Sequence, residues 1–398
     1  MNIFPKLFIS IRNLEIYFIA GYVDEQNNFE FLEKSSLQIE EIRDNKISDL
    51  DKITNIIKKN ILPLEEKVNY TFKDTIVILD FFDKFYVNLS GFKKLNGTQI
   101  SKENITYILN FLKSSVETFE PKKKIIHIFN SKYTLDKKKI DNLPIGLFGE
   151  SYTHELSFNM MNRSDYKNLE IIFEKCNLKI KKILFESFIK GTLISEMFPN
   201  IETFYYIKLN DNDAKIIFVE NDVVKYEQKF KFGTDIIIKD IFKITHLNTE
   251  NIIKIITDHE KIDELSENEI LEEKYFKNAK FRKIKKVLIK DIARARIKEL
   301  SEIIFSQNIN FKTTNRVKKT IFLEIKDKKH LNCFKNIYHY HFSDSKKFEL
   351  KFLEETKLKD DLIAADRIVQ FGWKKEAIPV SDTKKSIISS FFGLLFNN

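Results

Sequence analysis

Apolar and polar positions follow the same order of patterns in two separate stretches of the chain. In the first stretch, two β-branched and aromatic runs between Lys6 and Val23 break at Arg12–Asn13, which predicts a β-hairpin. In the second, Phe204 to Val219 predicts strand, turn and strand, and Val223 to Lys231 predicts a third strand. Because the order strand, strand, strand, helix occurs twice, the pattern predicts a duplicated α/β fold.

Helical periodicity marks several further segments. Apolar residues from Leu50 to Ile61 recur at helical spacing and predict a helix over Ile47 to Ile61 that ends before Pro63. Ser101 and Asn104 predict a capped helix over Ser101 to Ser115. The remaining patterns predict helices over 164–176, 187–197, 235–244, 249–259, 288–307 and 358–371, and strands over 75–87, 122–133, 151–160, 179–184, 320–325 and 337–342.

Glycine is scarce, with 9 residues in 398, and no two glycines are adjacent. Phosphate-binding loops need clustered glycines so that backbone N–H groups can approach the phosphate closely. The closest pair here is Gly146 and Gly149. The usual glycine-rich mononucleotide and dinucleotide sites are therefore excluded.

Charge and cysteine content indicate the kind of partner and the cellular compartment. Lys and Arg number 67 against 58 Asp and Glu, a net charge of +9 that favours an anionic partner: lipid headgroups, an acidic peptide or nucleic acid. Two cysteines, Cys176 and Cys333, cannot build a disulfide framework and point to a reducing, cytosolic compartment. We expect neither a membrane-spanning helix nor a signal peptide.

Several motifs, taken in order from Lys6 onward, resemble the FtsA family of bacterial cell-division proteins, which belongs to the actin-like superfamily. The family's strand, Tyr-x-Leu-Asp and Asn-Pro-x-Gly stretch is matched between Lys124 and Asn159, and its Cys-Gly-Leu by Cys176, Asn177 and Leu178. A left-handed Asn can replace the glycine at that helix end. The other matching residues are His127, Phe129, Tyr133, Leu135, Asp136, Asn142, Pro144, Gly146, Gly149, Gly233, Asp235, Asp240, Ile241, Arg296 and Glu299.

The resemblance implies an α/β, actin-like fold, a duplicated RNase H-like architecture in which a small inserted α+β subdomain replaces one actin subdomain. It divides the chain into a first core subdomain (1–87 and 163–196), the insert (88–162), a second core subdomain (197–240 and 301–378), a partner-binding subdomain (241–300) and a linker with a terminal amphipathic helix (379–398).

The same resemblance locates the two phosphate turns of actin-like ATPases, and both are degenerate here. The first turn falls on Ser10, Ile11 and Arg12–Asn13, with neither acid nor glycine. The second falls on Lys208 to Asp213, where the three glycines are replaced and Asp211 and Asp213 add negative charge. The adenosine-binding Gly-Gly corresponds to Glu324–Lys326, and Lys254 remains from the ribose-side helix. We expect no catalytic residues and no cofactor, with ATP and Mg²⁺ bound only if the degenerate positions Ser10, Arg12, Asn210, Asp211, Asn212, Asp213 and Lys254 still form a site.

The C-terminal segment carries an apolar stripe that follows two lysines. Its length of about 13 residues is too short to span a bilayer but suits a helix lying in the membrane interface. The resemblance to the C-terminal anchor of FtsA supports this assignment, and the alternative is a terminal helix that docks on the protein core. The predicted membrane-binding residues are Lys384, Lys385, Ile387, Ile388, Phe391, Phe392, Leu395 and Phe396.

The basic run from Lys277 to Arg296 has three interpretations: a solvated helix face, a nucleic-acid patch, or a binding site for the acidic and apolar C-terminal peptide of the tubulin-like protein FtsZ. The resemblance favours the peptide over nucleic acid, with Lys283, Arg294 and Arg296 as contact residues. Nearby, His330, Cys333, His339 and His341 could suggest a metal site. We expect no metal, because alternating residues on the predicted strand 337–342 are more often structural.

The function implied by the resemblance is that of a pseudo-ATPase adaptor. Such a protein would tether FtsZ polymers to the cytoplasmic face of the bacterial inner membrane at the division site. It would form homo-oligomers or filaments and contact later division proteins through residues 88–162. The alternatives are a PilM-like actin-fold protein of type IV pilus assembly, which lacks the C-terminal anchor, and an active actin-like ATPase.

Overall fold

A computed structural model describes residues 4–12, 15–43, 45–258, 268–276, 280–311, 319–343, 347–372 and 376–379. The chain divides into two compact units. The first contains residues 1–202, 220–226 and 356–398, and the second contains residues 203–219 and 227–355.

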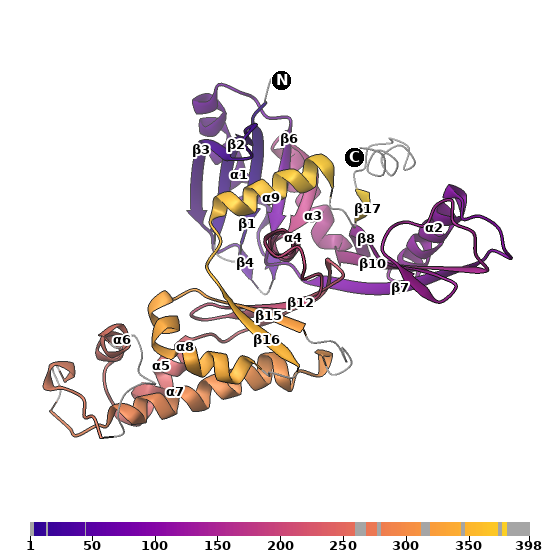
Figure 1. The fold of residues 1–398 in the computed structure, drawn as a ribbon. Coiled ribbons are helices and arrows are strands. Elements are labelled where there is room, and N and C mark those ends of the chain that lie inside the picture. Colours follow the sequence, from indigo (N-terminus) through magenta and orange to yellow (C-terminus); the bar gives the residue numbers. More distant parts are fainter. Residues whose placement is uncertain are drawn as a thin grey trace. The chain divides into compact units, whose positions relative to one another are not determined.

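The first unit is built on a five-stranded sheet, shown in indigo to magenta in Figure 1. Strands β1 (Lys6–Ile11), β2 (Glu15–Val23) and β3 (Phe29–Gln38) form an antiparallel meander. Strand β6 (Asp74–Leu79) then pairs in parallel with β1, and β11 (Lys179–Phe185) pairs in parallel with β6. The strand order is therefore β11-β6-β1-β2-β3.

Two pairs of helices accompany this sheet. Helix α1 (Leu50–Val68) packs against α3 (Arg163–Lys175), and α4 (Glu186–Met197) packs against α9 (Leu358–Phe371). Asp49 caps the start of α1 by accepting a hydrogen bond from the Lys52 N–H, and Asn69 ends the helix at φ 51°. Asn177, which follows α3, has φ 56°, as predicted for the residue that replaces the family's glycine.

The third sheet belongs to the first unit, and its order is β17-β8-β10-β7. Its strands are β7 (Lys84–Lys94), β8 (Lys123–Leu135), β10 (Ser151–Asn162) and β17 (Glu376–Pro379), with β9 (Lys138–Ile140) paired to β8. Strands β7, β8 and β10 lie between β6 and α3 in the sequence, whereas β17 follows α9. Helix α2 (Lys102–Phe119) buries Ile105, Ile108 and Leu112 in the core of this sheet. Ser101 and Asn104 cap α2 reciprocally, as predicted. A short pair, β4 (Ile42–Arg43) and β5 (Lys46–Ile47), completes the strands of the first unit.

The second sheet has the order β14-β13-β12-β15-β16. Strands β12 (Phe204–Leu209) and β13 (Ala214–Glu220) form an antiparallel hairpin, and β14 (Val223–Phe230) follows as its edge strand. Strand β15 (Lys319–Ile325) pairs in parallel with β12, and β16 (Phe348–Leu353) pairs in parallel with β15. This order reproduces that of the first sheet strand for strand.

The helices of the second unit pack on one another and on this sheet. They are α5 (Asp235–Thr245), α6 (Thr249–Asp258), α7 (Lys286–Ser301) and α8 (Lys328–Phe342). Helix α7 continues into a π-helical turn, Glu302–Ser306, and short 3₁₀ turns span Glu273–Tyr275 and Ile309–Phe311. Helix α7 contacts both α5 and α8.

The repeated order of three antiparallel strands followed by two parallel ones identifies the duplicated RNase H-like arrangement of the actin-like fold. The predicted α/β actin-like fold class is thus confirmed. The boundaries drawn for the individual subdomains remain predictions, although the third sheet begins at Lys84 and receives its last strand from residues 376–379.

Four local predictions were wrong. The segment 337–342 is the end of helix α8, because Asp327 caps that helix and His330, Cys333, Phe334, Ile337 and Tyr338 are buried at helical spacing. Helix α1 passes through Pro63, since its buried stripe of Ile53, Ile57 and Ile61 continues to Leu64. The predicted strand 75–87 is divided between β6 and β7. Pro379, assigned to the linker, belongs to β17. No segment was predicted for β3, β16 and β17, or for the short strands β4, β5 and β9.

Candidate functional site

The second phosphate-turn position is a tight hairpin turn at the end of β12. The Asn210 N–H donates to the Asp213 carbonyl, and the Asn210 side-chain amide donates to the Asp213 carboxylate at 2.8 Å. The carbonyls of Asn210 and Asp211 accept hydrogen bonds from the N–H groups of Thr234 and Asp235. A Cβ at Gly233 would lie 2.1 Å from the Asn210 carbonyl oxygen, so this glycine is required for the close approach.

The carboxylates of the same turn are solvent-accessible. Asp213 is exposed, Asp211 is partly exposed, and the Lys326 ammonium lies 3.9 Å from the Asp211 carboxylate. The turn thus presents acidic side chains at the position where the resemblance predicts the glycine N–H groups of an actin-like ATPase. Such a turn repels a polyphosphate unless a cation lies between them.

The first phosphate-turn position is only partly described, because Asn13 lies outside the described residues. Ser10 is buried within β1, and the Arg12 guanidinium lies 5.0 Å from the centre of the Tyr17 ring.

Helices α4 and α9 are joined by a buried ion pair between Lys190 and Asp361 at 2.7 Å. Burial raises the pKa of Asp361, while the Lys190 ammonium and the Arg12 charge act to lower it.

Of the two residues at the predicted adenosine-side positions, Glu324 is buried and Lys254 is exposed. Glu324 is buried at the end of β15, where it accepts a hydrogen bond from the Tyr206 hydroxyl at 2.8 Å and pairs with Lys208 at 3.0 Å. Lys254 is exposed on α6, and its ammonium lies 6.0 Å from the Tyr275 ring. Glu324 is therefore part of the core of the second unit, and Lys254 is a surface residue.

A groove of about 500 Å³ lies between α7 and α8 in the second unit. Arg294 from α7 lies in it, together with the positive Lys290 and the 75% exposed Tyr340 of α8. The groove is lined by Lys290, Arg294, Asn336, Ile337, Tyr340 and His341. Two cations beside an exposed aromatic ring suit a peptide with acidic and apolar side chains.

The three predicted partner residues lie in different surroundings. Arg294 lines the groove, and its nearest acidic neighbour, Asp291, is 3.8 Å away. Arg296 is tied within the protein, because its guanidinium donates to Asp240 and, at 2.5 Å, to Glu299. Lys283 is exposed before α7 and is not among the groove residues.

Sequence reasoning missed Asn336 and Tyr340, because the C-terminal half of α8 was assigned to a strand. Lys290 lies on α7 within the basic run 277–296, but it was not among the three residues chosen as peptide contacts. The helical spacing of Cys333, Phe334, Ile337 and Tyr338 after the Asp327 cap was the signal that could have found the two α8 residues. Once α8 is a helix, Asn336 and Tyr340 lie one turn apart on the surface that faces the groove.

The other predicted features are placed as follows. His330 is buried and its Nε2 lies 2.9 Å from the Tyr338 hydroxyl, and no cluster of metal-ligating side chains occurs in the described ranges. The predicted membrane-binding residues, Lys384 to Phe396, lie outside the described residues. None of the helices that the structure describes is long and apolar enough to cross a membrane.

Comparison with known proteins adds several fold neighbours. No family model and no curated protein matches the sequence. The PilM–PilN type IV pilus biogenesis complex is 7% identical, with 92% of this chain and 98% of that chain covered and a TM-score of 0.49. The ethanolamine utilization protein EutJ from Carboxydothermus hydrogenoformans is 9% identical, covering 94% and 91%, with a TM-score of 0.42.

A ROK family transcriptional regulator, a homologue of the Escherichia coli MLC protein, is 9% identical, covering 92% of this chain and 78% of that one, with a TM-score of 0.44. All three TM-scores are below 0.5. The fold assignment therefore rests on the strand order of the two sheets.

Proposed function

We propose that this protein is an adaptor similar to FtsA, which binds the C-terminal peptide of FtsZ and holds FtsZ polymers at the cytoplasmic face of the bacterial inner membrane. The observation that carries the proposal is the groove between α7 and α8, with Lys290, Arg294 and Tyr340 on its surface. An acidic and apolar peptide would meet cations and an aromatic ring there.

Within this groove, Arg294 is the residue best suited to bind a carboxylate. Its side chain is 51% exposed, and its 3.8 Å neighbour Asp291 is itself 58% exposed, so a surface pair of this kind is weak and easily exchanged. Arg296 is already bonded to Asp240 and Glu299. The proposal therefore transfers the main contact from Arg296 to Arg294.

The proposal includes the loss of ATPase activity. The acidic turn at Asp211 and Asp213 and the engaged Glu324 support a pseudo-ATPase. In the same proposal, Lys384 to Phe396 bind anionic lipids, residues 88–162 contact later division proteins, and the chain assembles with copies of itself at the division site.

The test is a titration of fluorescent FtsZ C-terminal peptide from the same organism with the full chain, followed by fluorescence anisotropy. Arg294→Glu should weaken binding by about 1–3 kcal/mol, roughly 5- to 150-fold, because a charge-assisted contact becomes a repulsion. Tyr340→Ala should weaken binding through lost apolar contact. Arg43→Glu, an exposed charge reversal on β4 in the first unit, is the matched control and should bind normally.

Two outcomes would contradict the proposal. Wild-type protein that fails to bind the peptide at millimolar concentration would remove FtsZ as the partner. Equal affinities for wild type, Arg294→Glu and Tyr340→Ala would leave the partner possible but remove the α7–α8 groove as its site.

A further inference from the structure

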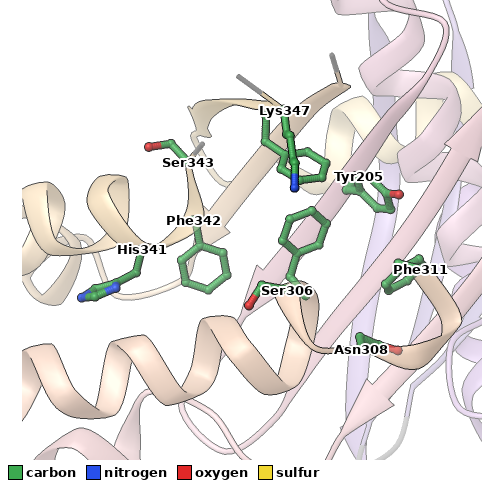
Figure 2. A pocket seen from close by; sticks show the side chains of 10 residues that line it. Tyr205, Ser306, Asn308, Phe311, His341, Phe342, Ser343 and Lys347 are labelled. Atoms are coloured by element: carbon green, nitrogen blue, oxygen red, sulfur yellow. The ribbon is translucent and has the colours of Figure 1, made fainter. Parts of the chain in front are cut away.

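A second cavity in the second unit lies beyond the end of α7 and shares the lining residue His341 with the proposed peptide groove. Its volume is about 240 Å³. Figure 2 shows side chains from β12, the π-helical turn, the 3₁₀ turn, α8 and β16 gathered around it. Its lining residues are Tyr205, Phe305, Ser306, Asn308, Phe311, His341, Phe342, Ser343, Lys347 and Phe348.

The cavity and the degenerate phosphate turn lie at opposite ends of the strands of the second sheet. Tyr205 is the second residue of β12, Phe348 is the first of β16, and the turn Asn210–Asp213 follows the other end of β12. Because β12, β15 and β16 run in parallel, the cavity is at their amino ends. Nucleotides in open α/β sheets bind at the carboxyl ends, so this cavity is distinct from the nucleotide position of the fold.

Aromatic rings form its walls. The Tyr205 ring centre lies 4.9 Å from that of Phe305 and 5.1 Å from that of Phe311, and the Phe305 and Phe348 centres are 4.7 Å apart. These three pairs are edge-on, at 71° to 79°, whereas the rings of Phe305 and Phe311 are tilted at 37°. A flat aromatic guest can pack against such walls with the same offset or edge-on geometry.

The π-helical turn forms part of the cavity wall. In Glu302–Ser306 the Gln307 N–H donates to the Glu302 carbonyl at 2.8 Å, a bond that encloses one residue more than an α-helical turn. Within this turn Phe305 is buried and Ser306 is exposed. Turns of this kind are frequent at functional sites, which agrees with a ligand at this position.

The charge around the cavity selects the guest. Its ten lining residues include Lys347 and His341 but no carboxylate. The Lys347 side chain extends from the rim toward the ring-lined interior (Figure 2). A second ammonium, that of Lys319, lies 5.6 Å from the centre of the Tyr205 ring. Aromatic cages commonly bind quaternary ammonium ions, but these cations would repel one.

We infer that this cavity binds a small aromatic carboxylate. The ring of the ligand packs against the cavity-facing surface of this aromatic cluster, and its carboxylate accepts hydrogen bonds from the Lys347 ammonium and from the hydroxyl of Ser306 or Ser343. This site does not depend on FtsZ binding, on nucleotide or on the C-terminal segment.

The experiment uses the full chain and three probes of nearly equal shape: 3-phenylpropionate, 3-phenylpropan-1-ol and 3-phenylpropylamine. Binding is measured by saturation-transfer NMR, with dissociation constants from titration. The carboxylate should bind about tenfold more tightly than the alcohol, and the amine should bind more weakly still, because only the carboxylate gains a charge-assisted bond.

Two exposed positions give variants that separate the ring from the charge. Ser306→Trp fills the cavity and should abolish binding of every probe. Lys347→Met keeps the walls, so the carboxylate should lose its advantage over the alcohol while the alcohol still binds. Lys328→Met, at a 70% exposed lysine in the first turn of α8, is the control and should leave all three affinities unchanged.

Three results would overturn the inference: no signal from the carboxylate at millimolar concentration, equal affinity for the carboxylate and the amine, or carboxylate binding that survives Ser306→Trp.

Discussion

The strand β17 is held on β8 by three buried ionisable groups, and the change Glu376→Gln tests how much they contribute. The Glu376 carboxylate accepts a hydrogen bond from the Lys182 ammonium at 2.8 Å and lies 3.1 Å from Nδ1 of His127. Glu376 and His127 are fully buried, and the Lys182 side chain is 8% exposed. In the Gln variant the Lys182 charge stays buried without a counterion.

The magnitude follows from the shifted titration of the carboxyl group. Burial alone would raise the pKa of Glu376, but the Lys182 ammonium and the hydrogen bond to His127 outweigh burial and lower the pKa from 4.5 to about 2. A carboxyl pKa lowered from 4.5 to about 2 corresponds to about 3 kcal/mol of stabilisation. Removing one partner of a buried ion pair costs a similar amount, about 3–5 kcal/mol.

The sign of the pH dependence is also fixed. Because the pKa of Glu376 is lower in the folded chain, its contribution to stability is complete above the unfolded value near 4.5 and is lost as the pH falls toward about 2. The Gln variant lacks that contribution at all pH values. Its free energy of unfolding should therefore depend less steeply on pH between about 4.5 and 2 than that of the wild type.

The assay is urea unfolding at pH 7, followed by the fluorescence of Trp373, the single tryptophan, which stands three residues before Glu376. Glu25→Gln, at an exposed turn position of the first unit, is the matched control and should change little. A Glu376→Gln protein within 1 kcal/mol of the wild type, with the same pH slope, would refute the reasoning about the buried cluster.

Three further predictions concern the proposed function. Millimolar Mg-ATP should neither be hydrolysed nor raise the melting temperature, whereas a ligand at 100 times its Kd adds about 2.7 kcal/mol; a clear upward shift would restore a nucleotide site. Arg296→Ala should lower the free energy of unfolding by about 1 kcal/mol through loss of the Asp240 and Glu299 contacts, with Arg294→Ala close to neutral in the same urea titration; equal effects would mean that the Asp240 contact contributes nothing. Phe391→Asp with Phe392→Asp should sharply reduce sedimentation with anionic liposomes while peptide binding persists, because two large apolar groups become charged; a double variant, or a chain ending at Ser381, that pellets as well as the parent would favour the PilM-like alternative.

The duplicated sheets could be predicted because their signal is local. Each begins with strands joined by short turns, and the apolar runs at Lys6–Val23 and Phe204–Val219 fall within one or two residues of β1, β2, β12 and β13. The caps at Ser101 and Asn177 were likewise visible in the sequence, because a cap is specified by one or two residues.

The errors came from segments whose structure depends on distant partners. In α8 the sequence Tyr-His-Tyr-His alternates like a strand, yet Cys333 and Phe334 on the preceding turn already require a buried helical face. Strand β17 has four residues and pairs with β8, almost 250 positions earlier, so no local pattern marks it. Because the end of α8 was predicted as a strand, Tyr340 was missing from the predicted partner residues.

Buried charge was the least predictable feature. Lys225 is 7% exposed, and its ammonium donates to Glu155 at 2.9 Å, to Ser157 at 2.7 Å and to Asn88 at 3.1 Å. In a chain with 67 basic residues, nothing in the sequence distinguishes this lysine from those at the surface. The sequence likewise does not distinguish Arg294 from Arg296, two residues later. Arg296 donates to Asp240 and Glu299, whereas Arg294 lines the groove.

The pairing of β17 has a mechanical consequence for a protein that is pulled by whatever follows residue 379. Strand β17 runs antiparallel to β8, with Pro379 opposite His127 and Glu376 opposite Phe129. A load on the chain beyond Pro379 would therefore peel the strand from that end and reach Glu376 last. The ion pair between Glu376 and Lys182 would then be the last contact of β17 to break. Force would reach α9 only after these two buried charged groups had been exposed to water.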